Sequence, residues 1–158
     1  MKLNLLSIAA LAAACGVTMW AADNSGAVFW GVAEMKNRDK ELAAKMDETK
    51  AGIGNLLTKP TFNAIVFHRE GSGQSEAHEK LADFLIVRSG EGAILVGGKS
   101  IDAKETAPGE TRGKRVEGGT RYKLTPGDVI YIPAGVPHQV IVENGKQLNA
   151  MVIKVEEK

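Results

Sequence analysis

Four side chains that can bind a metal ion stand in two separate parts of the chain. Glu76, His78 and Asp83 lie close together, and His138 follows about sixty residues later. Because side chains alternate between the two faces of a strand, Glu76 and His78 share one face of the segment 74–80. Two imidazoles and two carboxylates that converge suit Fe(II), Mn(II), Zn(II) or Ni(II). We therefore predict that these four residues bind a divalent transition metal ion.

The same residues have a second interpretation, in which they form a hydrogen-bonded polar pocket without a metal and Asp83 orients a histidine. Within a metal site, Glu76 is either a fourth ligand or a general base. His68, the third histidine, shares a strand face with Ala64 and Val66. We expect His68 to lie outside the site.

Short runs of Val, Ile, Leu and Phe, separated by Gly, Asn and Asp, make up most of the chain after residue 60. This pattern is typical of a many-stranded antiparallel fold. Gly127 and Asp128 start one strand, and the Pro and Gly residues between 133 and 137 end it, so that His138 begins the next strand. The expected strands are 63–70, 74–80, 83–88, 93–97, 121–124, 129–132, 138–142 and 148–155.

Two segments differ from this strand pattern. Between Trp30 and Thr49, apolar residues fall on one helical face, which predicts an amphipathic helix that Gly52 and Gly54 end. The polar segment 98–120 has little periodicity and is long for a hairpin connection. It is either a lid over a barrel mouth or a solvated surface hairpin.

The segment 127–138, with the sequence GDVIYIPAGVPH, resembles the second conserved motif of the cupin superfamily. Gly127, Pro133, Gly135 and His138 stand at the intervals of that motif. The resemblance implies an all-β fold, a cupin-type double-stranded β-helix or jelly-roll barrel, here with one N-terminal helix. It also implies a homodimer, since small sandwiches have strand edges that need covering.

Glu76, His78, Asp83 and Gly90 match the spacing of the first cupin motif. The resemblance implies that Glu76, His78, Asp83 and His138 are the metal ligands. This sequence departs from the family in two places, because Glu76 stands where a histidine is common and Asp83 where a glutamate is common. The two changes would make the site more anionic and bring the metal closer to the strand of Asp83.

The N-terminal residues have the order of a signal peptide, with Lys2 followed by an apolar run from Leu5 to Ala14. We expect a periplasmic or secreted protein whose mature part has no membrane span. In an alternative, cleavage after Ala14 leaves Cys15 as a lipid anchor. The expected organisation is a signal peptide (1–22), an N-terminal helical segment (23–60) and a cupin β-barrel domain (61–158).

The net charge of +1, with acidic and basic residues mixed along the chain, argues against a nucleic-acid partner and favours a small-molecule ligand. Cupin barrels include dioxygenases, isomerases, lyases and binding modules, so the fold leaves the function open. We expect a metal-dependent enzyme that acts on a small oxygenated metabolite. The alternative is a non-catalytic module that binds a small molecule or a sugar in the same pocket.

Overall fold

The structure is a computed structural model that describes residues 26–157. One helix, α1 (Val32–Ala44), precedes a long series of strands. The signal peptide predicted for 1–22, including Cys15, lies outside the described residues. The strands are β1 (Ala51–Lys59), β2 (Phe62–Arg69), β3 (Ser75–His78), β4 (Leu81–Gly90), β5 (Gly92–Val96), β6 (Lys99–Ile101), β7 (Lys104–Ala107), β8 (Glu110–Gly113), β9 (Arg115–Glu117), β10 (Thr120–Leu124), β11 (Val129–Ile132), β12 (His138–Ile141) and β13 (Leu148–Glu156).

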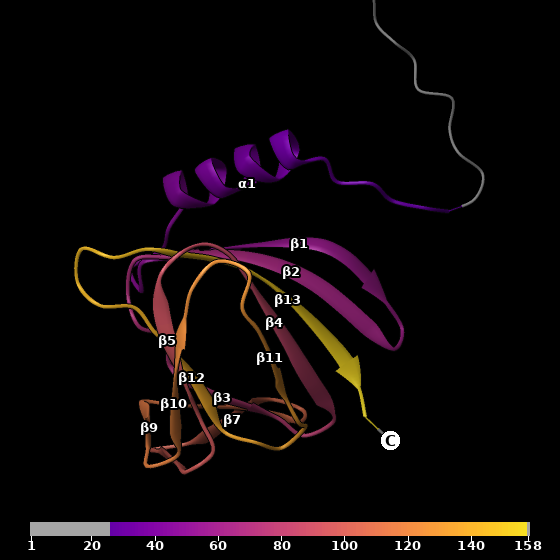
Figure 1. Cartoon of the computed structure of the whole chain (residues 1–158). Coiled ribbons are helices and arrows are strands. Elements are labelled where there is room, and N and C mark those ends of the chain that lie inside the picture. The colour runs from indigo at the N-terminus through magenta and orange to yellow at the C-terminus, as the bar shows by residue number, and fades with distance from the viewer. Residues whose placement is uncertain (1–25, 158) are drawn as a thin grey trace, which may run out of the picture.

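Two antiparallel sheets form a barrel-like sandwich (Figure 1). The first sheet has the strand order β1-β2-β13-β4-β11, and the second has the order β10-β5-β12-β3-β8-β7. The short strands β6 and β9 pair with each other. The predicted all-β cupin fold with one helix is confirmed.

The alternation of side chains along the strands divides the barrel interior into an apolar part and a polar part. Leu85 and Val87 share the inward face of β4 with Asp83. In β12, His138 precedes the inward Val140, and in β13 Lys154 follows the inward Val152. Each strand thus places its polar side chain two residues from an apolar one, and the polar residues meet at one end of the barrel.

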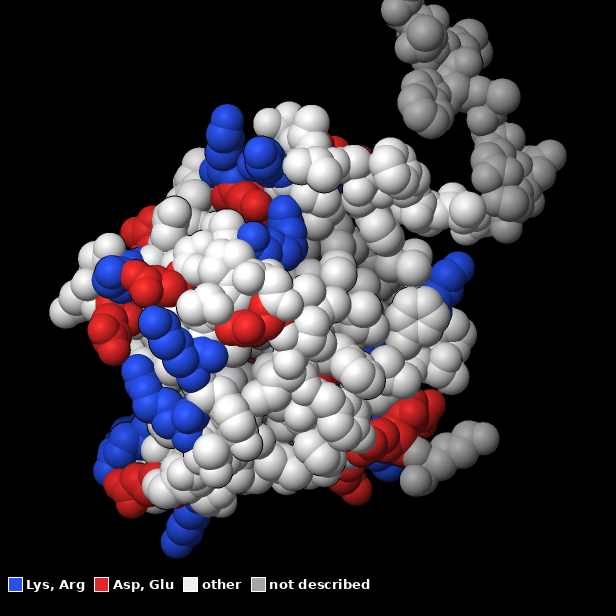
Figure 2. All heavy atoms as spheres, in the orientation of Figure 1, with Lys and Arg blue, Asp and Glu red and all other residues white. Residues whose placement is uncertain are grey.

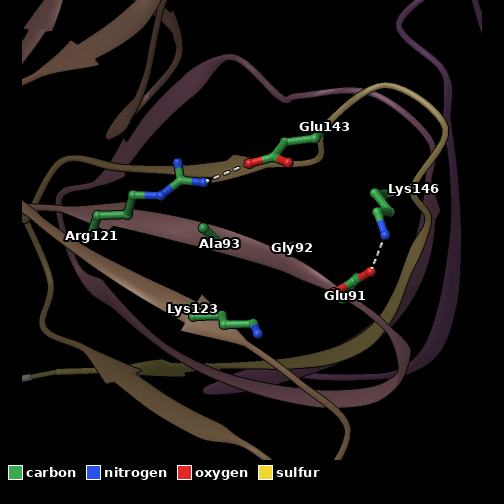
Figure 3. A pocket seen from close by; sticks show the side chains of 7 residues that line it. All are labelled: Glu91, Gly92, Ala93, Arg121, Lys123, Glu143 and Lys146. Carbon is green, nitrogen blue, oxygen red and sulfur yellow. Dashed lines mark hydrogen bonds and ion pairs between the residues drawn. The ribbon is translucent and has the colours of Figure 1, made fainter.

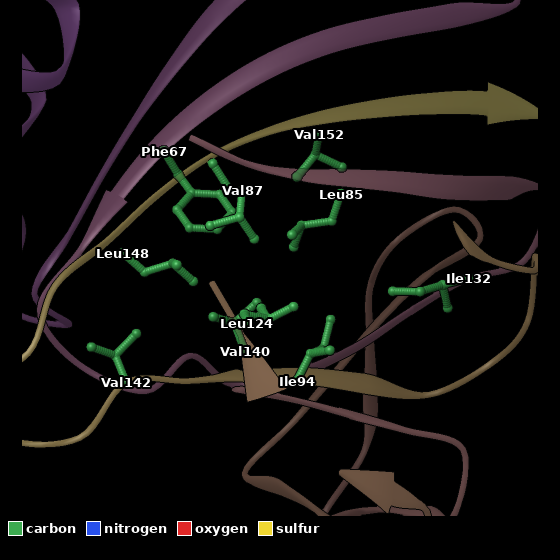
Figure 4. Packing of buried hydrophobic residues seen from close by; sticks show 11 residues of the cluster. Phe67, Leu85, Val87, Ile94, Leu124, Ile132, Val140, Val142, Leu148 and Val152 are labelled. Atoms are coloured by element: carbon green, nitrogen blue, oxygen red, sulfur yellow. The ribbon is translucent and has the colours of Figure 1, made fainter. Parts of the chain in front are cut away.

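The apolar part is a continuous core between the two sheets (Figure 4). Burial of one large aliphatic or aromatic side chain contributes about 1.5–3 kcal/mol, so this cluster is the main source of stability. It holds the strands that carry the polar end in place. Its members are Phe67, Leu85, Val87, Ile94, Leu124, Ile132, Val140, Val142, Leu148, Ala150 and Val152.

The helix in the structure is shorter than the sequence predicts. It ends at Ala44, and residues 51–59 form strand β1. Gly52 and Gly54 therefore lie in a strand and do not end the helix. At Gly52, a Cβ atom would lie 2.2 Å from the carbonyl oxygen of Leu42, and at Gly54 it would lie 3.3 Å from Cδ2 of Leu42. The two glycines leave room for α1 to pack against β1, outside the barrel (Figure 1).

The segment 98–120, which the sequence leaves open between a lid and a surface hairpin, forms the strands β6 to β9. The hairpin of β7 and β8 extends the second sheet, because β8 pairs along the whole of β3. Glu110 and Arg112 of β8 lie opposite His78 and Glu76 in that pairing. This segment therefore forms part of the barrel wall next to the polar end.

The charged side chains on the face shown in Figure 2 are mixed in sign, with acidic and basic groups next to each other along one side. This agrees with the balanced charge of the sequence. Among residues 26–157, no helix is long and apolar enough to cross a membrane.

Candidate metal centre

Glu76, His78 and His138 come together at the polar end of the barrel. Strand β3 carries Glu76 and His78, and His138 lies directly opposite Glu76 where β12 pairs with β3. Within the described part of the chain, these three residues form a group whose candidate ligand atoms all lie within 4.8 Å of one another. The convergence of the two histidines expected from two distant motifs is therefore present in the structure.

The turn before His138 is shaped by the Pro and Gly residues of the second motif. Gly135 has a φ of 75°, a conformation that other residues rarely adopt. Its N–H donates to the carbonyl oxygen of His78 at 2.7 Å. This backbone bond links the turn to the end of β3, so the two histidine-bearing segments hold each other in place.

Both imidazoles direct Nε2 towards the same space. His138 Nδ1 lies 3.0 Å from the carbonyl oxygen of Val136, and His78 Nδ1 lies 2.6 Å from the carboxylate of Glu110. Since a carbonyl and a carboxylate only accept hydrogen bonds, each Nδ1 is the protonated nitrogen. The Nε2 atom of His138 is buried and has no hydrogen-bond partner. A neutral imidazole with a free Nε2 is the form that binds metals.

Asp83 lies next to both histidines but outside the group of three. Its Oδ2 atom is 3.5 Å from Nε2 of His78 and 3.5 Å from Nε2 of His138. Burial raises the pKa of Asp83, but the two neighbouring imidazoles and the charge of Lys154 outweigh that effect and hold the pKa well below its usual value. The carboxylate is therefore charged, and its Oδ1 atom is buried without a partner.

Lys154 places an ammonium group inside this site. Its Nζ atom lies 2.6 Å from Nε2 of His78 and 2.7 Å from Oδ2 of Asp83. Lys154 and Asp83 are direct partners where β13 pairs with β4. Its side chain is only 13% exposed. Burial lowers the pKa of Lys154, and the charge of Asp83 offsets part of that shift. The protein thus carries its own cation beside the candidate metal ligands.

Strand β8 contributes the outer groups of the site. Arg112 forms a close ion pair with Oε2 of Glu76, whose Oε1 lies 3.5 Å from Nε2 of His138. Glu110 accepts the hydrogen bond from His78 Nδ1, as described above. These contacts orient Glu76 and His78 in the way that second ligand shells commonly orient metal ligands.

His68 lies on the opposite face of its strand, away from the pocket. Its Nδ1 atom is 2.9 Å from the side chain of Asn149, and its Nε2 atom is 3.2 Å from Glu70. Both bonds hold it as a buried structural residue. The prediction that Glu76, His78, Asp83 and His138 bind a metal stays a prediction, although the structure brings all four side chains to one end of the barrel.

Sequence reasoning missed Lys154, Arg112 and Glu110. The signal for Lys154 was present, because a lysine stands at an inward position of a strand that is otherwise apolar on that face. The other two lie in a segment without periodicity, so nothing in the sequence points to their position beside β3.

A hollow of about 480 Å³ connects this site with the rest of the barrel interior. Glu76, Asp83, His138 and Lys154 line one part of it, and the apolar core forms a wall. A second depression lies outside the barrel (Figure 3), where Arg121 pairs with Glu143 and Lys146 pairs with Glu91. Its charges largely compensate one another, so the interior hollow is the better candidate.

The sequence of residues 109–154 matches the Cupin domain family, and this stretch contains the complete second motif. The chain thus has a cupin fold and matches the cupin family over this stretch. No curated protein sequence matches this cupin.

Solved structures with the same fold include three informative neighbours. The DMSP lyase DddQ from Ruegeria pomeroyi DSS-3 is 17% identical, with a TM-score of 0.50 over 67% of this chain and 47% of the lyase. KdgF from Halomonas sp. is 14% identical, with a TM-score of 0.51 over 70% of this chain and 84% of KdgF. TT1209 from Thermus thermophilus is 18% identical, with a TM-score of 0.52 over 75% and 94% of the two chains. This cupin spans about half the length of the lyase, and these similarities show the fold alone.

Proposed function

We propose that this cupin is a metal-dependent enzyme that acts on a small oxygenated metabolite inside the barrel. The observation that supports this proposal is the buried Nε2 atom of His138, which has no partner and faces the donor atoms of Glu76 and His78. A buried nitrogen without a partner is costly unless it binds something. The reaction types that we propose are those of a lyase, an isomerase or a dioxygenase.

The donor set fits Fe(II), Mn(II), Zn(II) or Ni(II). His78, His138 and Glu76 would hold the ion, with Asp83 as a further ligand next to both imidazoles. When bound, the ion would polarise an oxygen atom of the substrate as a Lewis acid. Arg112 pairs with the Glu76 carboxylate beside the histidines, and apolar residues of the core form one wall of the hollow.

Glu76 has two possible roles that a conservative substitution separates. If its carboxylate is a ligand, Glu76→Gln lowers the affinity for the metal, because the amide oxygen carries no charge. If Glu76 is a general base, the variant keeps the metal and loses turnover only. We expect the ligand role, because Oε1 lies 3.5 Å from Nε2 of His138.

The alternative function is a metal-free module that binds a small molecule, and Lys154 is the observation that favours it. Its ammonium group bridges His78 and Asp83 and so neutralises part of the acidic charge without any ion. The two functions differ in metal content, which can be measured directly.

Metal analysis of the purified full chain tests the proposal. We expect about one transition metal ion per chain, and a severe loss of occupancy in His138→Ala and His78→Ala, because few ligands remain to compensate. His68→Ala is the matched control and should keep full occupancy, since His68 bonds to Asn149 and Glu70 outside the site. Absence of metal after reconstitution with each of the four ions would refute the enzyme proposal in favour of the binding module.

We also propose that the protein is exported to the periplasm or secreted. The basic start and apolar run of residues 1–22 support this proposal. The mature protein should begin near residue 23 when its N-terminus is sequenced after expression in a bacterial host. A mature N-terminus at a lipid-modified Cys15 would establish the anchored alternative, and one at Met1 would contradict export.

A further inference from the structure

Arg69 faces the same hollow as the candidate metal centre. It follows Ile65 and Phe67 on the inward face of β2, and all three residues line the hollow together with Glu76 and His138. Its guanidinium group lies against Gly73, so closely that a Cβ atom added to this glycine would lie 3.1 Å from Cζ of Arg69. The side chain is therefore held in a fixed place at the edge of the hollow.

The guanidinium group of Arg69 has no bonding partner among the described residues. Its Nη1 atom is buried without a hydrogen bond, and the described residues include no ion pair of Arg69. Asp47 is nearby, but one of its oxygens already accepts hydrogen bonds from Thr49 and Ala51. A guanidinium offers five N–H donors in a planar fork, so an unpaired one next to a cavity is ready to bind an acceptor.

The other three cations that line the hollow are all paired. Arg112 pairs with Glu76, Lys154 with Asp83, and Lys114 with Asp102. Arg69 is therefore the one lining cation of the described chain without an ion pair, and Asp47, which also lines the hollow, interacts with it only through its charge. The ring of Phe67, 5.9 Å from Cζ of Arg69, and the side chain of Ile65 provide an apolar surface beside it.

We propose that Arg69 binds the carboxylate of a small organic acid and thereby sets the class of substrate that this cupin accepts. A carboxylate matches the planar fork of a guanidinium with two parallel hydrogen bonds. One free positive charge suits a group with one negative charge, and the apolar surface suits a short carbon chain. The remainder of the acid then extends through the hollow towards Glu76, His78 and His138.

This inference builds on the proposed function, because it names the substrate class of the same pocket. The binding step itself involves Arg69 and needs no metal ion. It is therefore tested on the full-length protein after removal of metals with a chelator.

Pairs of ligands that differ only in charge provide the test. The probes are acetate, 3-hydroxybutanoate and gluconate, each compared with its primary amide, and binding is measured by saturation-transfer NMR and by calorimetry. We expect the wild-type protein to bind at least one acid about tenfold or more tightly than its amide, since hydrogen bonds to a charged group are stronger than those to a neutral one. If no acid is preferred over its amide, the inference is wrong.

Substitutions of Arg69 assign the preference to this residue. Arg69→Met keeps the apolar stem and should lower the affinity for the acid about tenfold while leaving that for the amide unchanged. Arg121→Met is the control, because Arg121 pairs with Glu143 on the outer surface (Figure 3). Arg69→Lys keeps the charge without the planar fork and should also bind the acid more weakly. Unchanged affinity in both folded Arg69 variants, or in Arg69→Lys if Arg69→Met fails to fold, would overturn the inference.

Inorganic phosphate serves as a competing anion. We expect it to displace the acid only weakly, because the site offers one free guanidinium. Tighter binding of phosphate that also depends on Arg69 would overturn the carboxylate assignment. If metal analysis finds an ion but no acid is preferred, only this inference fails. A preference for acids in a protein that binds no metal would instead refute the enzyme proposal and leave a module that binds organic acids.

Discussion

At the scale of single residues, the polar end of this barrel combines potential metal ligands with an internal cation. His138 and Asp83 each keep a buried atom without a partner, while the ammonium group of Lys154 already donates to Nε2 of His78 and to Oδ2 of Asp83. The ammonium group and a metal ion would both be drawn to the same negative charge. The position of Lys154 would therefore affect how strongly this site attracts a metal ion.

We predict that Lys154→Met raises the affinity for a divalent metal ion about tenfold or more. The substitution removes a buried positive charge a few ångströms from the candidate ligands and keeps a side chain of similar length. Competition with a chromophoric chelator measures the change. Lys146→Met serves as the control, because Lys146 pairs with Glu91 on the outer surface. Weaker metal binding in Lys154→Met would show that the ammonium group supports the site and does not compete with the ion.

At the scale of secondary-structure elements, two segments outside the expected barrel strands shape the molecule. The strand β8 adds Glu110 and Arg112 to the site, and β1 provides the surface on which α1 packs. The helix is further joined to the barrel by Asp39, whose carboxylate accepts two hydrogen bonds from Arg88 of β4. These contacts give the N-terminal segment a structural role next to the first sheet.

We predict that Gly52→Ala lowers the free energy of unfolding by about 1–3 kcal/mol, because the new Cβ collides with backbone that has little room to move. The obstructing atom is the carbonyl oxygen of Leu42, 2.2 Å from the Cβ position. Urea unfolding measures the loss, and limited proteolysis should show faster cleavage around α1. Gly54→Ala is the matched control and should cost less, because it meets only the flexible end of the Leu42 side chain at 3.3 Å. Equal losses in both variants would contradict this explanation.

At the scale of the whole molecule, an apolar area on the outer face of the first sheet is exposed to solvent. Phe84 and Tyr131 form a ring pair at 5.0 Å between centroids, and Val129 beside them is 61% exposed. Strand β11, which carries Tyr131 and Val129, is the edge of that sheet. An exposed edge with apolar side chains is a place where a second chain can pair.

We predict that the protein is a homodimer that uses this edge. Light scattering at micromolar concentration should give twice the mass of one mature chain. Val129→Glu should reduce the dimer, since a charge would be buried at the interface. Ile53→Glu changes an equally exposed residue on β1, the opposite edge, and should have no effect. A monomer for the unmodified protein would show that the prediction is wrong.

The sequence by itself determined which side chains share a strand face and where the chain turns. Periodicity predicted that Glu76 and His78 share one strand face and that Asp83 and Leu85 share another. The Pro and Gly residues before His138 predicted the chain reversal that the structure contains. These features are local, since they depend on neighbours a few residues apart. The strand bounds expected from residue 63 onwards agree with the structure to within a few residues, apart from the segment 98–120.

Only the tertiary structure decided which charges meet at the site. The contact of Lys154 with His78, the pairing of Arg112 with Glu76 and the unpaired state of Arg69 all depend on strands that are far apart in the sequence. The two glycines at 52 and 54 were misread for the same reason, because their function is to leave space for Leu42 and not to end a helix. Side-chain type and local spacing carry no information on such partners, which arise from the order and register of strands in the folded sheets.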